Sequence, residues 1–174
     1  MSRIVSRIVG LAERPRRAPR AIAVSLLLLL VGFDNIFDYS VNFAAVQHVM
    51  SMDTVSGDEG TMWRAITTPA LHHIAYAIII TAELASGALC MWGALRLWKL
   101  RQAPAPVFNA GKDLAAAGLV IAAALYLFAF LTIGGEWFDM WRSPTWNAQA
   151  SAFRFFATAG LVLLFVSQKD DELA

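Results

Sequence analysis

Four long apolar blocks dominate this chain, and each holds close to the ~20 residues that a helix needs to cross about 30 Å of hydrocarbon. They cover residues 21–39, 71–98, 112–133 and 148–167. No water is available inside a bilayer for unpaired backbone groups, so spanning segments form helices or closed barrels. Runs this uniformly apolar lack the alternating pattern of a barrel. The sequence therefore predicts an all-α, four-helix transmembrane bundle.

The composition supports a single membrane domain. The chain has 174 residues, of which 58% are hydrophobic and 16% charged, whereas a soluble domain is nearer about one half and one quarter. The single cysteine excludes a disulfide framework and a Cys-based metal site, and the net charge of +1 argues against a nucleic-acid partner. We expect a basic arm (1–20), one four-span domain (21–168) with outer connections 40–70 and 134–147, and a tail (169–174).

Topology follows from the distribution of positive charge. A basic arm before a short apolar block is also how a signal peptide begins, but no small-x-small cleavage site follows, so we expect a retained anchor. The arm, residues 96–112 and the tail carry eleven of the fourteen lysines and arginines. The positive-inside rule then places both termini in the cytoplasm of a bacterial inner membrane, with both aromatic-rich connections in the periplasm.

A polar stripe follows one face of the second block. His72, Tyr76 and Glu83 are separated by four and seven residues, which places them on one helix face. Glu83 lies ~18 Å beyond Leu71 at ~1.5 Å per residue, near the membrane midplane. An ionisable residue at this depth indicates a functional site. The stripe suits proton transfer or cation binding; the alternative is a protonated, structural Glu83 that hydrogen-bonds to a neighbouring helix.

Four further charged residues, Asp34, Asp38, Glu136 and Arg154, fall in the outer third of the bilayer. An unpaired buried charge is strongly penalised. We therefore predict that Arg154 pairs with Asp34, Asp38 or Glu136. A structural clasp is the favoured interpretation, and a site for an anionic or quinone-like ligand is the alternative.

Small residues recur along the second and third blocks. The third block has Ala115, Gly118 and Ala122 on one side, and the second has Ser86 and Gly93. Small side chains let helix backbones approach closely, which is the usual basis of packing in lipid. The second and third helices are expected to form a tight antiparallel pair.

The two outer connections are rich in aromatic and polar residues. Helical spacing at the start of the first predicts an interfacial helix, and the tryptophans predict a belt at the headgroups. The residues of this predicted periplasmic motif are Asn42, His48, Met50, Met52, Asp53, Trp63, Arg64, Trp137, Trp141, Trp146 and Asn147. His48, His72 and His73 are weak candidates for a metal or haem, because no paired ligand motif accompanies them. No cofactor is predicted.

The same connections carry a resemblance to a known family. The residues concerned are Asn42-Phe43, the run His48–Thr54, Arg64-Ala65-Ile66, Glu136-Trp137-Phe138, Met140-Trp141, Ser143, Trp146-Asn147, Gln149 and Ala152-Phe153-Arg154. From about Ser25 onward the chain resembles the bacterial group of predicted small integral membrane proteins called domain of unknown function 2165. The resemblance implies a small multi-span membrane protein, and it supplies no activity, cofactor or catalytic residue.

The sequence indicates the function of the protein less clearly than its fold. Small size and a structured aromatic rim favour a non-catalytic accessory or assembly subunit of a larger membrane complex, with the bilayer and other membrane subunits, or copies of itself, as partners. The alternative is a small proton, ion or solute carrier or channel that uses the stripe on the second helix. A metal-, haem- or quinone-binding protein comes third. An enzyme is not expected, because no nucleophile–base pair or phosphate loop is present.

Overall fold

The computed structural model of the protein describes residues 2–56 and 59–171. Its helices are α1 (Ser2–Phe37), α2 (Tyr39–Ser51), α3 (Pro69–Lys99), α4 (Ala105–Ala110), α5 (Asp113–Ala124) and α6 (Gln149–Ser167). Two 3-10 helices, η1 (Glu59–Arg64) and η3 (Met140–Arg142), lie between them, and the π-helix η2 (Leu125–Trp137) continues α5. Four helical segments, 17–37, 69–99, 105–137 and 149–167, are long and apolar enough to cross a membrane. The predicted all-α, four-span architecture is confirmed.

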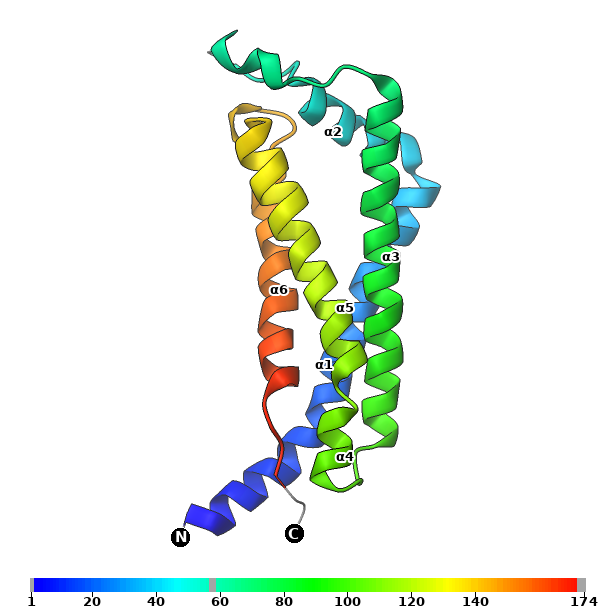
Figure 1. The fold of residues 1–174 in the computed structure, drawn as a ribbon, viewed down its shortest axis with the longest axis vertical. Coiled ribbons are helices and arrows are strands. Elements are labelled where there is room, and N and C mark those ends of the chain that lie inside the picture. Colours follow the sequence, from blue (N-terminus) through cyan, green and yellow to red (C-terminus); the bar gives the residue numbers. More distant parts are fainter. Residues whose placement is uncertain (1, 57–58, 172–174) are drawn as a thin grey trace.

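The helix boundaries differ from the predicted ones mainly in the first half of the chain. Helix α1 begins at Ser2 and includes the basic arm predicted for residues 1–20, and the span itself begins at Arg17. The backbone leaves helical geometry at Asp38, and α2 follows at once. Figure 1 shows α2 running obliquely across one end of the bundle.

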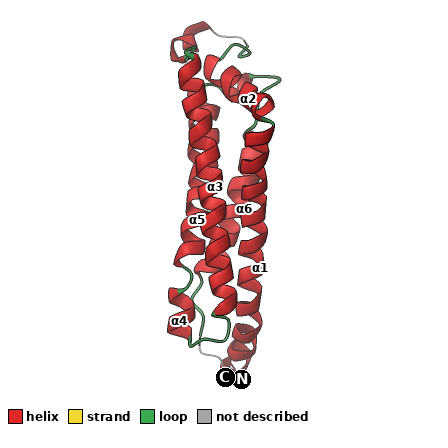
Figure 2. Cartoon of the chain, turned by 90° about the vertical axis from the view of Figure 1, so that its right-hand side faces the viewer, coloured by secondary structure: helices red, strands yellow, loops and turns green. Residues whose placement is uncertain are grey.

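The two ends of the bundle are distinct. Both chain termini lie at one end, called here the terminal end (Figures 1 and 2). The opposite end, called the loop end, is formed by α2, η1, η3 and the connections between them.

Helix α3 is the centre of the packing, because α1 and α5 both lie along it. On the α5 side, a Cβ at Gly118 would lie 2.6 Å from the Ser86 carbonyl oxygen, and one at Gly93 would lie 2.1 Å from the Ala115 nitrogen. On the α1 side, a Cβ at Gly87 would lie 2.8 Å from Leu29 Cγ. Glycine is therefore required at these positions for the helix backbones to approach this closely.

The interior is unevenly filled along its length. Large side chains of the main core, such as Leu28, Leu97, Phe108 and Leu119, fill the half toward the terminal end. Toward the loop end, α3 diverges from η2 and α6, and α2 lies over the space between them (Figures 1 and 2). The cavity described below lies in this half of the bundle.

A buried ionic cluster closes the terminal end. The Asp170 carboxylate, just after α6, lies 3.1 Å from Arg17 Nε on α1 and pairs with Lys112 Nζ before α5. Asn109 on α4 exchanges hydrogen bonds with the Asp170 backbone at 2.9 and 3.0 Å. Only 4% of Arg17, 6% of Lys112 and 4% of Asp170 is exposed. The tail is thus a structural part of the bundle.

We expect Gly118→Ala to destabilise the bundle by about 1–3 kcal/mol, because the new methyl group would overlap backbone atoms of α3. Gly160→Ala is the matched control: a Cβ there has nothing within 4 Å, so helix propensity makes it neutral or stabilising. Thermal unfolding in mild detergent, followed by circular dichroism, measures both. Equal melting temperatures for the two variants would contradict the close α3–α5 contact.

Asp170→Asn should also lower the melting temperature, since it removes the anion shared by two buried cations. Breaking a buried ion pair costs up to about 3–5 kcal/mol. Asp113→Asn makes the same chemical change at an exposed position on α5 and should cost less than about 1 kcal/mol. An Asp170→Asn protein as stable as the Asp113→Asn protein would show that the cluster does not hold the tail.

Candidate functional site

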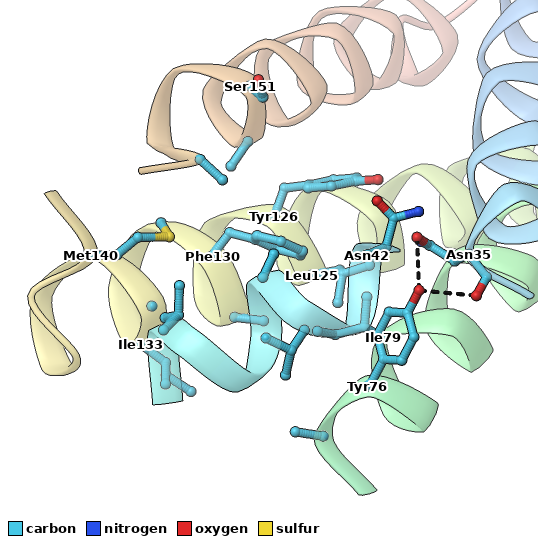
Figure 3. A pocket seen from close by; sticks show the side chains of 18 of the residues that line it. Asn35, Asn42, Tyr76, Ile79, Leu125, Tyr126, Phe130, Ile133, Met140 and Ser151 are labelled. Atoms are coloured by element: carbon cyan, nitrogen blue, oxygen red, sulfur yellow. Dashed lines mark hydrogen bonds between the residues drawn. The ribbon is translucent and has the colours of Figure 1, made fainter. Parts of the chain in front are cut away.

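The most deeply placed acidic side chain is Glu83, close to the middle of the 31-residue helix α3 and only 2% exposed. Asn35 Nδ2 on α1 donates to Glu83 Oε2 at 2.7 Å, and the Tyr126 hydroxyl on η2 donates to Oε1 at 3.1 Å. The Tyr76 hydroxyl donates to the backbone oxygen and to Oδ1 of Asn35 at 2.9 and 3.1 Å (Figure 3). Three helices therefore meet at one carboxyl group.

No positive charge from the described residues compensates Glu83. Among the side chains described, those of residues 17–56 and 59–171, no lysine, arginine or histidine forms an ion pair with it. Its hydrogen-bond donors are a neutral amide and a neutral phenol. An isolated buried carboxylate is costly. Neutralising Glu83 therefore requires a proton or a cation from outside this network.

A cavity of about 440 Å³ opens above Glu83 toward the loop end. Its walls come from α1, α2, α3, η2, η3 and α6, and most of them are apolar or aromatic. Figure 3 shows Tyr76, Tyr126 and Phe130 lining it from two opposing elements. Its polar residues are Asn35, Asn42, Tyr76, Glu83, Tyr126 and Ser151. An apolar cavity of this size with a few converging polar groups has the usual character of a small-molecule site.

The wall opposite α3 is the π-helix η2. Phe138 N donates to the Ile133 oxygen five residues back at 3.0 Å, which closes the wide turns of this helix. At its end, a Cβ at Gly135 would lie 2.4 Å from Gln149 Nε2, so this glycine lets η2 approach the start of α6. Segments of π-helix are rare and occur frequently at functional sites. Here the segment carries Tyr126 and Phe130 into the cavity.

The structure places the predicted stripe on one buried side of α3. His72, Tyr76 and Glu83 are 1%, 2% and 2% exposed, but only Tyr76 and Glu83 line the cavity. His72 Nε2 lies 2.6 Å from the Ile66 carbonyl oxygen, so it donates to the segment that precedes α3. Its Nδ1 has no hydrogen-bond partner in the described part of the chain.

The structure does not bring the predicted ion pairs together. Arg154 is exposed on α6 and donates to Ser151 Oγ at 2.8 Å, and it pairs with none of the three predicted acids. Asp34, Asp38 and Glu136 are exposed as well; Asp34 accepts from Asn42 at 3.5 Å. Because Arg154 and the three acids are all exposed, none of them carries the cost of a buried charge that would require a pair.

An ion pair that the sequence did not reveal lies at the loop end. Asp139 accepts from Arg64 at 2.9 Å and lies 3.6 Å from Arg142. Asp139 has φ 50°, which is uncommon for a residue other than glycine. Thr54 and Ser143 hydroxyls lie 2.8 Å apart. These contacts join the two connections into one cover over the cavity.

The other residues of the predicted periplasmic motif lie at or near the loop end. His48 Nδ1 lies 2.8 Å from Asp53 Oδ2, and the imidazole stacks on Trp146 with centroids 4.8 Å apart. His73 stacks on Phe43 at 4.2 Å. The cavity is lined by Asn42, Met50 and Trp146. Met52 is buried. The remaining motif residues are exposed: Trp63, Trp137, Trp141 and Asn147.

The three histidines have separate surroundings. His48 contacts Asp53, His72 contacts Ile66 and His73 contacts Tyr39, whose hydroxyl lies 2.7 Å from its Nδ1. In the described segments no three His, Cys, Asp or Glu side chains are grouped as a metal would need.

The sequence did not indicate that Asn35 and Tyr126 are the hydrogen-bond donors to Glu83. Tyr126 is the only hydroxyl-bearing aromatic residue in its apolar block, and this was an available signal. Which of several polar residues faces Glu83 depends on helix register across the bundle, which one sequence does not supply.

Comparison with known proteins places this chain in a family. Residues 17–169 match a family model described as predicted small integral membrane protein (DUF2165). No curated protein and no solved structure matches the chain. The matched range runs from the first span through the last and includes every residue that lines the cavity. The chain therefore belongs to the DUF2165 family of small integral membrane proteins.

Proposed function

We propose that this protein binds a small, largely apolar molecule in the cavity above Glu83, as a membrane binding protein or carrier. The observation that carries the proposal is the position of a buried carboxyl group without a counter-charge at the floor of a mostly apolar cavity. A buried polar group of this kind is costly to maintain. A purely structural bundle would be better served by an apolar residue at position 83.

The geometry of the cavity supports a ligand with two unlike ends. Its volume of about 440 Å³ lies in the range of small-molecule sites. Apolar residues of α2 and η2 surround its upper part, and the polar residues Asn35, Tyr76, Glu83 and Tyr126 gather at its base. The apolar body of a ligand would contact the walls, and its polar end would reach Glu83.

The proposed orientation places this cavity in the outer leaflet of a bacterial inner membrane. The terminal end carries eleven of the fourteen lysines and arginines, and such an excess marks the cytoplasmic side. Exposed tryptophans at both ends of the spans, such as Trp63 and Trp141 at one end and Trp92 and Trp98 at the other, support this placement across the bilayer.

The accessory-subunit role stays a prediction. Both proposals are compatible with one protein, because a subunit of a larger complex can also hold a ligand. Purification from the native host in mild detergent tests the accessory role by itself: a fixed set of partner subunits would support it, and a protein that elutes alone would contradict it.

Thermal unfolding of the purified protein tests ligand binding. Cys90, the only cysteine, is fully buried, so a thiol-reactive dye reports unfolding directly. The probes are a cation and a neutral molecule of similar shape, methyltriphenylphosphonium and triphenylphosphine oxide, and the anion tetraphenylborate. We expect at least one probe to raise the melting temperature, because a ligand that binds only the native state stabilises it.

The matched variants are Ala129→Phe, which fills the cavity, and Ala117→Phe, which makes the same change on the exposed side of α5. The probe-induced rise should disappear in the first and persist in the second. Equal rises in both variants, or no rise with any probe, would refute the proposed binding function.

A further inference from the structure

We propose that the ligand is a lipophilic organic cation, with its positive charge next to Glu83 and an apolar body against the aromatic wall of η2. This inference rests on the proposed binding function and assigns the chemical class of the ligand. Three observations carry it: the charge of the cavity, the direction of its hydrogen bonds and the composition of its walls.

The cavity is lined by one acidic side chain, Glu83, whose charge is negative when it is ionised. No lysine, arginine, histidine or second acid is among its lining residues. A bound anion would lie against an acid with no base nearby, so the site repels it. A cation supplies the counter-charge that the described residues do not, and in a water-poor cavity the attraction between two such charges is large.

The hydrogen-bond donors at the base of the cavity are already engaged. Asn35 Nδ2 and the Tyr126 hydroxyl donate to Glu83, and the Tyr76 hydroxyl donates to Asn35. The lone pairs of the carboxylate oxygens remain available, and they favour a ligand that brings positive charge.

Aromatic rings surround the path from the loop end to Glu83. Tyr126 stacks on Phe155 with centroids 4.7 Å apart and lies 5.4 Å from Phe130. Phe138 and Trp146 line the cavity nearer the loop end. Aromatic faces attract organic cations, most strongly where water is excluded. A buried carboxyl group together with aromatic walls is the chemistry that recognises a quaternary or protonated amine with an apolar body.

Equilibrium binding in mild detergent tests the inference with two probes of similar shape. Methyltriphenylphosphonium carries a permanent positive charge, whereas triphenylphosphine oxide is neutral and only accepts hydrogen bonds. The wild-type protein should bind the phosphonium at least about tenfold more tightly. Glu83→Gln keeps the size and an acceptor oxygen but removes the charge, so it should abolish this preference, measured as the ratio of the two affinities in the same variant.

A second variant keeps the test decisive if Glu83→Gln does not fold. Phe130→Leu leaves the carboxyl group in place and removes one aromatic face, so it should lower the preference for the phosphonium over the oxide by roughly two- to fivefold. Equal or tighter binding of the neutral probe by the wild-type protein overturns the cation assignment and leaves the binding function standing. Binding of neither probe, with no thermal shift from the borate, overturns both.

Discussion

The carboxyl group of Glu83 is the point on which the rest of the structure depends. It accepts hydrogen bonds from α1 and from η2 while lying on α3, so it joins the first three spans at the middle of the bundle. On the terminal side of this junction the helices pack closely through glycines, and a buried ionic cluster holds the tail. On the loop side they diverge around a cavity. One half is rigid scaffold, and the other half is available for binding.

Much of this arrangement was predictable because it depends on short-range regularities. Length and hydropathy set the number of spans. Helical periodicity predicted that Glu83 shares one face with His72 and Tyr76, and all three are buried on α3. The small residues around Gly118 indicated the close pairing of α3 and α5. Each of these inferences needs only the sequence of one helix or of two adjacent ones.

What the sequence did not reveal depends on register between distant segments. The partner of Glu83 on η2 follows from the rotation of one helix against another, and a π-helix shifts that rotation further. The Asp170 cluster requires the tail to fold back against α1. Pairing of Arg154 with an acid was expected from the cost of a buried charge, yet its flexible side chain lies exposed beside Ser151. A long charged side chain near the end of a membrane span avoids the cost of burying its charge when its charged group extends to the polar surface.

Anomalous diffraction from crystals grown with tetraphenylarsonium tests the central claim most directly, because arsenic marks the position of the cation without any assumption about affinity. The account predicts an arsenic peak inside the cavity, between the Glu83 carboxylate and the ring of Phe130. A cavity without arsenic, with peaks only at the exposed tryptophans of the loop end, would contradict it.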